Sequence, residues 1–263
     1  MKDLVLHEVA EGVLRLTLND PATRNSLSEA MMASLQESLR EAAANPAVRG
    51  VVIGATGPAF SSGHNLKEIT ARRSNEDAGE AYFTALFRAC AEFMVAIVRN
   101  PKPVIAEVQG LASAAGCQLV ASCDLAIAAD TAGFCTPGVN IGLFCSTPMV
   151  ALSRDVMPKH AMEMLLTGDV ISAHEAQRIG LVNRVVSPNM LAETVAELAR
   201  KIASKSQMTI KMGKAALYEQ QDLVLEDAYA LTAQVMAENL LKRDAREGIA
   251  AFLGKRNPQW TDQ

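Results

Sequence analysis

The sequence predicts an α/β fold with a parallel sheet, followed by an all-helical region toward the C-terminal end. Three short runs, at residues 50–54, 103–108 and 124–129, are apolar apart from Glu107 and Asp124, which is typical of strands buried on both faces. Stretches with helical periodicity, near 78–98 and 115–123, separate these runs. Because strands alternate with helices, we expect parallel pairing.

The N-terminal part begins this pattern with a strand, a turn and a helix. Residues 12–18 alternate apolar and polar side chains and predict a half-buried strand. The segment DPATRN at 20–25 consists of residues typical of turns and predicts a turn. Ser26 and Glu29 have capping-box spacing, so a helix is expected to begin at Ser26. Its apolar side consists of residues four apart, namely Leu27, Met31, Leu35 and Leu39.

The last third is helical in pattern. Ser172 with Glu175 repeats the capping-box spacing, and Ser187-Pro188 opens a further helix, where proline loses no helical hydrogen bond. From 206 to 253 the pattern is almost entirely helical. We therefore predict a core over residues 1–200 and a helical oligomerisation region over 201–263, packed on the body or on a neighbouring subunit.

Composition excludes several classes of protein. The 263 residues carry a net charge of −4 and no basic run, so no nucleic-acid partner is expected. The five cysteines are an odd number without a CxxC pair, which indicates buried thiols in a reducing compartment.

No signal core or run of ~18 apolar residues stands out, so we expect a cytoplasmic protein without a membrane partner. His7, His64, His160 and His174 form no metal-ligand pattern, and the sequence contains no GxGxxG or Walker motif; no metal, nicotinamide or ATP is expected.

Two strand-to-helix turns are rich in small residues. One is GPAFSSGHNLKE at 57–68, and the other is SAAG at 113–116. A turn into a helix leaves backbone N–H groups unpaired. Two such groups aimed at one point would form an oxyanion hole that stabilises negative charge on a carbonyl oxygen, although tight packing alone also selects small residues.

The segments GPAFSSGHNLKEI and VQGLASAAGCQLVASCDLAIA resemble the two signature segments of the crotonase (enoyl-CoA hydratase/isomerase) superfamily. DPATRNSLS, TPGVNIGL and EGIAAFLGKR resemble further elements in the family's order. Together they are similar to a subgroup of enoyl-CoA hydratase domain-containing proteins of mitochondria and bacteria. The resemblance implies a ClpP-like spiral of ββα units and homotrimers, often paired into hexamers. It also implies an acyl-CoA thioester as ligand, with no cofactor beyond its coenzyme A.

The resemblance also implies roles for individual residues. The N–H groups of His64, directly after Gly63, and of Ala115 would be the two oxyanion donors. The expected contacts to coenzyme A are Arg24, Ser62 and Lys67 and, reaching a neighbouring subunit's ligand, Phe252 and Lys255.

Two departures from the family pattern change the expected activity. Hydratases of the family use two glutamates, and the matching positions here are Gln118 and Gly138. A positioned acid or base typically contributes ~10²–10⁴-fold, so hydration of 2-enoyl-CoA is predicted to be weak or absent. Whether the chain is an enzyme stays open. The alternatives are a decarboxylase or other enolate-forming lyase acting on a malonyl-type CoA thioester, and a non-catalytic acyl-CoA binder.

Other side chains near these segments have two interpretations each. The His64 ring titrates near neutral pH and is a candidate acid or base, unless only its backbone matters. Cys145 and Ser146 are candidate nucleophiles or inert pocket lining, and Glu68 is a recruited acid or a solvated first-turn carboxylate. Asp124 is interpreted as structural.

Overall fold

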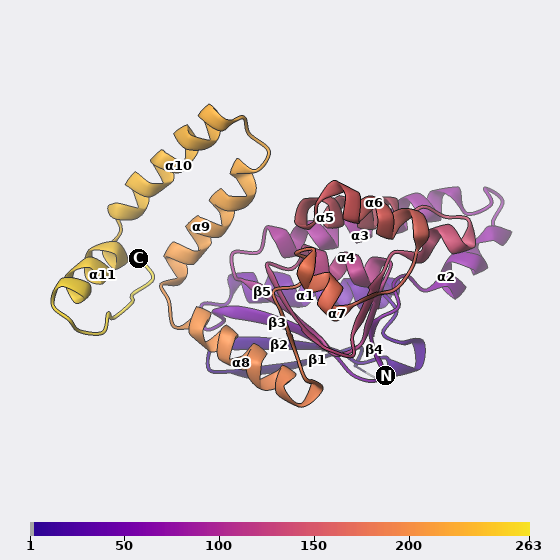
Figure 1. Cartoon of the computed structure of the whole chain (residues 1–263), viewed down its shortest axis with the longest axis horizontal. Helices are drawn as coiled ribbons and strands as arrows, with labels where there is room; N and C mark the ends of the chain where they lie inside the picture. The colour runs from indigo at the N-terminus through magenta and orange to yellow at the C-terminus, as the bar shows by residue number, and fades with distance from the viewer. Residues whose placement is uncertain (1–2) are drawn as a thin grey trace.

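The computed structural model describes residues 3–263 and builds the body from two sheets (Figure 1). The larger sheet has the order β1-β2-β3-β5-β7-β10, and the smaller has the order β4-β6-β8-β9. Only β1–β2 and β8–β9 pair antiparallel; the other pairs are parallel. The strands are β1 (Val5–Ala10), β2 (Val13–Leu18), β3 (Gly50–Ala55), β4 (Ala59–Ser61), β5 (Val104–Val108), β6 (Leu111–Ser113), β7 (Leu125–Ala129), β8 (Gly133–Cys135), β9 (Ile171–Ser172) and β10 (Arg184–Val186).

Each pair of consecutive strands, β3–β4, β5–β6 and β7–β8, leads into a helix, so the chain winds as the predicted spiral of ββα units. The α-helices are α1 (Glu29–Ala44), α2 (Leu66–Ala71), α3 (Glu80–Val98), α4 (Ala115–Ser122), α5 (Ser146–Asp155), α6 (Pro158–Thr167), α7 (Ala173–Arg178), α8 (Pro188–Ala203), α9 (Gln207–Gln220), α10 (Leu225–Leu240) and α11 (Arg243–Leu253). Short 3₁₀ turns lie at Pro21–Thr23, Arg72–Ser74 and Pro137–Ile141.

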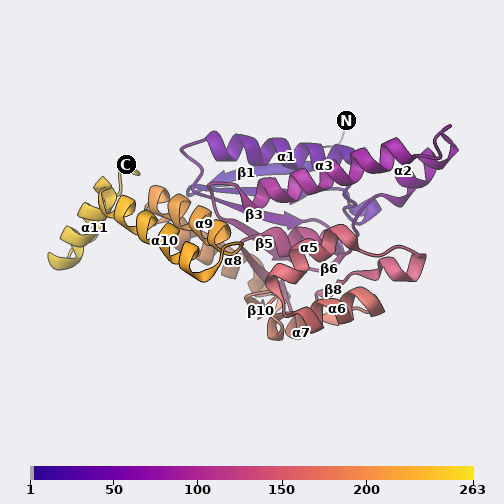
Figure 2. The ribbon, with the colours of Figure 1, turned by 90° about the horizontal axis from the view of Figure 1, so that it is seen from above.

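Strands β3, β5 and β7 of the larger sheet are buried on both faces, as their largely apolar sequences predict. Along β3, Val51 and Ile53 face the main core with α1 and α3, whereas Val52 faces a second cluster that includes Leu191 and Val195 of α8. The two faces alternate because successive side chains of a strand point to opposite sides. Figure 2 shows α1 and α3 lying alongside one another on one side of the sheet.

The start of α1 differs from the prediction. The helix begins at Glu29, and its N-cap is Ser28, whose side chain accepts from the Met31 N–H at 3.1 Å. Ser26 instead hydrogen-bonds Thr23, with 3.0 Å between the two hydroxyl oxygens. The predicted apolar side is nevertheless correct, since Leu27, Met31, Leu35 and Leu39 are all buried. Strand β1, which covers one edge of the sheet, was not predicted.

One helix contradicts the expectation that no apolar run has membrane length. Helix α3 has 19 residues and a mean hydropathy of 1.6 over its best window, which is long and apolar enough to cross a membrane by length and composition. Of that window, 28% is buried, and Leu86, Cys90, Phe93, Met94 and Ile97 face the protein interior. The other side of the helix is exposed and carries Ala85 and Ala89 together with Arg88 and Glu92.

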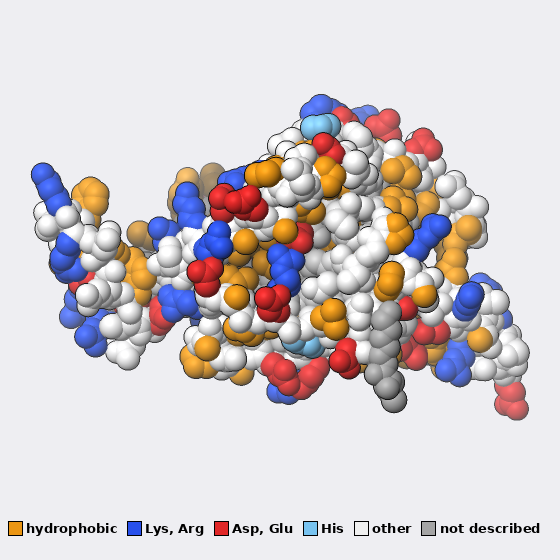
Figure 3. Space-filling model, turned by 90° about the horizontal axis from the view of Figure 1, so that it is seen from below, with side chains coloured by type: hydrophobic (Ala, Val, Ile, Leu, Met, Phe, Trp, Pro, Cys, Tyr) orange, Lys and Arg blue, Asp and Glu red, His pale blue; other side chains and the backbone are white. Residues whose placement is uncertain are grey.

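Helices α9–α11 form an arm that extends away from the body (Figures 1 and 2). Exposed apolar side chains follow the arm, namely Leu217, Val224, Leu225, Tyr229, Met236, Leu240, Leu241, Ile249, Phe252 and Leu253. Figure 3 shows the arm standing apart from the body, with hydrophobic side chains on the surface of both.

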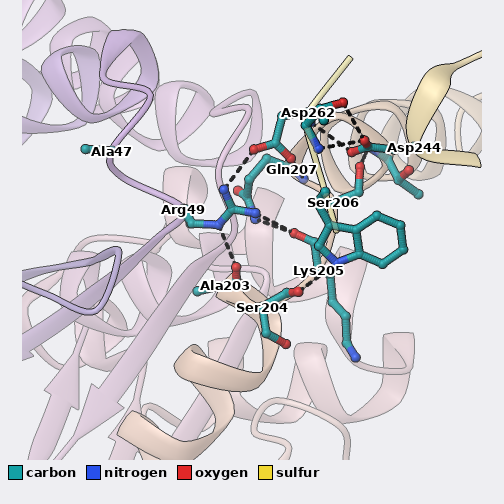
Figure 4. Close-up of polar contacts among 12 residues, drawn as sticks. Ala47, Arg49, Ala203, Ser204, Lys205, Ser206, Gln207, Asp244 and Asp262 are labelled. Atoms are coloured by element: carbon teal, nitrogen blue, oxygen red, sulfur yellow. Dashed lines mark hydrogen bonds and ion pairs between the residues drawn. The ribbon is translucent and has the colours of Figure 1, made fainter. Parts of the chain in front are cut away.

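A polar clasp, formed by Arg49, Asp244 and the final residues, holds the base of the arm (Figure 4). Arg49 donates to the Ala203 and Lys205 carbonyls, at 2.6 and 2.9 Å, and pairs with Asp262 at 2.8 Å. Asp244, which is buried, accepts the N–H groups of Thr261 and Asp262 at 2.8 and 3.0 Å. The clasp thereby ties α11 and the final residues to the end of α8.

Candidate functional site

The two small-residue turns predicted to carry function lie in contact with each other. They follow β4 and β6, which are neighbours in the smaller sheet. Gly63 has φ +84°, and a Cβ added there would lie 3.1 Å from the Ala115 nitrogen and 2.9 Å from the Ser113 carbonyl oxygen. Only glycine fits this position, because it accepts positive φ and leaves room for the second turn.

Two backbone donors result from this contact. Within residues 3–263, the N–H groups of His64 and Ala115 donate to no protein acceptor. Ala115 begins α4, so no earlier turn of that helix offers its N–H a carbonyl. The residue before it, Ala114, has φ 51° and ψ −116°, a conformation unfavourable for a residue with a Cβ. Hydrogen bonds to the Cys135 carbonyl, at 2.9 Å, and from the Gln118 N–H, at 3.0 Å, hold Ala114 in place.

The His64 ring is enclosed. It meets the Phe87 ring edge-on, with 5.4 Å between the ring centroids. Both ring nitrogens are buried and have no hydrogen-bond partner among the described residues. Burial lowers the pKa of His64, so the ring is neutral at physiological pH.

The two positions that replace the glutamates differ in environment. Gln118 lies on α4, one turn after Ala115, and is 4% exposed. Gly138 lies in the Pro137–Ile141 turn, where an added Cβ would meet the Leu143 carbonyl oxygen at 2.7 Å and the Cys145 sulfur at 2.9 Å. The Cys145 thiol therefore occupies space that a side chain at position 138 would need.

Three of the residues expected to contact coenzyme A lie close to the Gly63 turn. The Ser62 N–H donates to the Arg24 carbonyl at 2.9 Å, and the Ser62 hydroxyl donates to the Thr23 carbonyl at 3.1 Å. Arg24 ends the 3₁₀ turn with φ 57°, and Lys67 lies in the first turn of α2. The side chains of Arg24 and Lys67 are exposed.

The other two expected contacts lie elsewhere in the chain. Phe252 is on α11 and is 83% exposed, and Lys255 follows that helix. Helix α11 is at the far end of the arm, away from α2 and β4 (Figure 1). Within one chain the structure does not bring them to the Gly63 turn.

The remaining candidate acids and nucleophiles have structural contacts. Glu68 accepts from the Asn65 amide at 3.1 Å and from the Glu29 N–H at 3.3 Å, which joins the starts of α1 and α2. Burial raises the pKa of the Cys145 thiol, so it is protonated at rest, and the Ser146 hydroxyl donates to the Phe144 carbonyl at 3.4 Å. In residues 3–263 no three His, Cys, Asp or Glu side chains are grouped as metal ligands.

Sequence reasoning missed one carboxyl group near the site. Asp155, at the end of α5, lines the same cavity as Gln118. The residue as a whole is exposed, and desolvation of its carboxyl at the cavity raises the pKa to about 7. No motif marks it, because SRDVMP reads as an ordinary helix end.

A spiral of ββα units in which two strand-to-helix turns meet at a glycine is the architecture of a crotonase-fold protein. A sequence model of the family "Enoyl-CoA hydratase/isomerase" matches residues 8–263, and the chain belongs to that family.

Known relatives agree over nearly the full length. The chain is 49% identical over 253 residues to the human protein "Enoyl-CoA hydratase domain-containing protein 3, mitochondrial", covering 96% of this chain and 82% of the relative. The crystal structure of human enoyl Coenzyme A hydratase domain-containing protein 3 matches with a TM-score of 0.93 and 48% identity, covering 98% of this chain and 100% of that one. A crystal structure of an enoyl-CoA hydratase from Mycobacterium smegmatis matches with a TM-score of 0.94 and 48% identity, covering 98% and 99%. These similarities confirm the predicted fold and subgroup.

Proposed function

We propose that this chain binds acyl-CoA thioesters and polarises the thioester carbonyl with the N–H groups of His64 and Ala115. The observation that carries the proposal is the contact at Gly63, where an added Cβ would lie 3.1 Å from the Ala115 nitrogen. That contact supports a site in which the two unpartnered donors act together. A carbonyl oxygen that accepts both is stabilised as it gains negative charge, which favours an enolate. Family membership supports a CoA thioester as the carbonyl compound.

The coenzyme A part of the ligand would lie along Arg24, Ser62 and Lys67. Their exposed cations and backbone groups beside the Gly63 turn suit phosphate and adenine. Coenzyme A enters as part of the thioester, and no separate cofactor is proposed. Phe252 and Lys255 would reach a ligand in the neighbouring subunit of a trimer or hexamer, since they lie far from the site in their own chain.

The reaction itself is limited by the missing carboxylates. Gln118 cannot exchange a proton near neutral pH, and Gly138 has no side chain, so hydration of 2-enoyl-CoA would be weak or absent. A decarboxylase is the second candidate, because loss of CO₂ from a malonyl-type thioester forms an enolate without a carboxylate pair to place water. The neutral, enclosed His64 ring beside the donors is compatible with that step. A non-catalytic binder would show affinity without product.

The first experiment follows the enone absorbance of crotonyl-CoA. We expect the wild-type chain to be at least ~10²-fold slower than a hydratase with both glutamates, and Gln118→Glu to gain rate. Efficient hydration by the wild type would refute the argument from Gln118 and Gly138. Release of CO₂ from malonyl-CoA and methylmalonyl-CoA, measured in parallel, tests the second candidate.

The oxyanion donors are tested separately by infrared spectroscopy of a bound thioester labelled with ¹³C at the carbonyl. Binding to the wild type should shift the C=O stretch to lower frequency, and Gly63→Ala should abolish the shift because the added methyl forces the two turns apart. Gly213→Ala is a matched control, since an added Cβ there meets nothing within 4 Å. An unshifted stretch in the bound wild type would contradict the proposal.

Location and assembly stay predictions. The names of the vertebrate relatives include "mitochondrial", which gives the compartment of those proteins. From its own sequence we expect this chain to be a cytoplasmic protein.

A further inference from the structure

The short segment 24–27, which leads into α1, lies along one edge of β4. The Ser62 N–H donates to the Arg24 carbonyl at 2.9 Å, and the Leu27 N–H donates to the Gly63 carbonyl at 2.8 Å. Strand β6 pairs with β4 as well. Because a strand has only two hydrogen-bonding edges, the segment and β6 flank β4 from opposite sides. The Gly63 turn therefore lies between this segment and the turn that follows β6.

The hydrogen bond to Leu27 sets the direction of the His64 N–H. The Gly63 carbonyl and the His64 N–H belong to one trans peptide group, in which the two point in opposite directions. Because the Gly63 carbonyl is directed at Leu27, the His64 N–H is directed away from it. It thus points to the other side of β4, where the turn that contains Ala115 lies against Gly63.

Asn25 holds the segment in this position. It is completely buried and has φ 53°, a left-handed conformation that asparagine adopts more readily than most residues. Its side-chain amide donates to the Thr56 and Ala59 carbonyls at 2.7 and 2.9 Å, and its Oδ1 atom accepts the Asp20 N–H at 2.8 Å. These bonds fix Asn25 to the end of β3 and the start of β4. The position of Leu27, two residues further on, is fixed with it.

The Ser61 hydroxyl connects Asn25 to the Gly63 turn. It donates to the Asn25 carbonyl at 2.8 Å and accepts the Gly63 N–H at 3.3 Å, and Ser61 is as fully buried as Asn25. Both polar groups of Gly63 are therefore held, its N–H by Ser61 and its carbonyl by Leu27. The turn can rotate only if one of these buried bonds breaks, and a buried polar group without a partner is costly.

We propose that Asn25 and Ser61 are positioning residues, which keep the Gly63–His64 peptide oriented so that the His64 N–H can donate to the carbonyl of a bound ligand. An oxyanion donor is effective when it is aligned before the ligand arrives. Both residues act through the turn and not by touching the ligand, because their side-chain polar groups are bonded within the protein. This inference depends on the proposed function, since it assumes that the His64 N–H is an oxyanion donor.

The test follows the C=O stretch of bound butyryl-CoA, labelled with ¹³C at the carbonyl, in the wild type and in Ser61→Ala. We expect the shift to lower frequency to fall by about half in the variant, because one of the two donors loses its alignment. Ser38→Ala is the matched control. It also removes a buried serine hydroxyl that donates to a backbone carbonyl, at 2.7 Å, but it lies in the middle of α1 and should leave the shift unchanged. Thermal unfolding shows that both variants are folded and how far each is destabilised.

Asn25→Gly is a second variant, since glycine accepts φ 53° but lacks the amide, and it should reduce the shift in the same way. A full shift in Ser61→Ala, or equal losses in Ser61→Ala and Ser38→Ala, would mean that Ser61 only stabilises the fold. Either result overturns the inference, while the shift in the wild type continues to support the proposed function. If the bound wild type shows no shift, the proposed function fails, and this inference fails with it.

Discussion

At the scale of single residues, His64 contributes through two separate groups. Its backbone N–H directly follows Gly63, which lies against Ala115, and its ring nitrogens are buried beside Phe87 without a hydrogen-bond partner among residues 3–263. The sequence leaves open whether the ring or only the backbone of His64 acts. The enclosed ring disfavours protonation, which links this residue to the pH dependence of stability.

We predict that His64 makes the protein less stable in mild acid. Its folded pKa is lowered, so its contribution is fully present above the unfolded pKa of about 6.5 and is lost as pH falls toward the folded value. Urea denaturation between about pH 7.5 and 5 should therefore show a smaller loss of stability for His64→Gln than for the wild type. The exposed His174, changed to Gln, is the control. Identical pH slopes for wild type and His64→Gln would contradict the prediction.

Gly138 gives a second prediction at this scale. Gly138→Ala should destabilise the protein by roughly 1–3 kcal/mol, because the new methyl overlaps the Leu143 carbonyl and the Cys145 thiol. Thermal unfolding measures the loss, with Gly213→Ala as the control in open space. Cys145→Ala combined with Gly138→Ala should recover only part of the loss, since the backbone carbonyl remains. Full stability of Gly138→Ala alone would show that the turn adjusts.

The sequence indicated where the site lies but not how its side chains are arranged. The small residues around Gly63 and Ala115 predicted a close approach of two turns, because few other residues allow one. By contrast, the contact between Gly138 and Cys145, the thiol next to Gln118 and the raised pKa of Asp155 come from packing between separate elements. No spacing along the chain encodes those contacts.

At the scale of elements, a buried polar cluster attaches α9 to the body. Lys214 pairs with Asp124 at 2.6 Å and donates to the Ile97 and Lys102 carbonyls at 3.2 and 3.1 Å. The Tyr218 hydroxyl donates to the same carboxylate at 2.9 Å. The structural interpretation of Asp124 agrees with these contacts, but Lys214 and Tyr218 lie 90 or more residues away from it, so the sequence did not identify them.

Lys214→Met should therefore cost about 3–5 kcal/mol, because it leaves the Asp124 carboxylate without its charged partner in a site where the side chain is only 15% exposed. Urea denaturation gives the magnitude, and hydrogen exchange should show the loss first in α9. Lys201→Met, on the exposed side of α8, should change stability by less than about 0.5 kcal/mol. Equal effects of the two substitutions would mean that the pair does not hold α9.

Prediction at this scale succeeded where periodicity is strong. The parallel strands, α3, α4, α8 and the helical arm follow patterns that extend over many residues. The start of α1 was misplaced because Ser26 and Ser28 both offer a hydroxyl, and only the tertiary contact of Ser26 with Thr23 decides between them.

At the scale of the whole molecule, the contacts within a single chain do not explain why the arm carries so many exposed apolar side chains. Its exposed apolar side chains need a covering surface, and the clasp around Arg49 and Asp244 fixes the direction in which the arm extends. An arm that is held rigidly in one direction suits contact with a second copy better than folding back onto its own body.

We predict that Phe252 contributes to assembly. Light scattering should give a trimer or hexamer for the wild type and a lower mass for Phe252→Ser, which removes an apolar side chain that is 83% exposed in one chain. Phe252→Leu, which remains apolar, should assemble like the wild type. A monomeric wild type would show that the arm is covered in another way.

The backbone at Ala114 has a further consequence. An alanine at φ 51° and ψ −116° costs about 1–3 kcal/mol, and glycine would remove that cost. A screen for heat resistance would therefore favour Ala114→Gly. The same change would make the neighbouring Ala115 N–H more flexible. The more heat-stable variant should therefore bind the proposed thioester more weakly. At position 114, thermal stability and affinity for the proposed ligand therefore favour different residues.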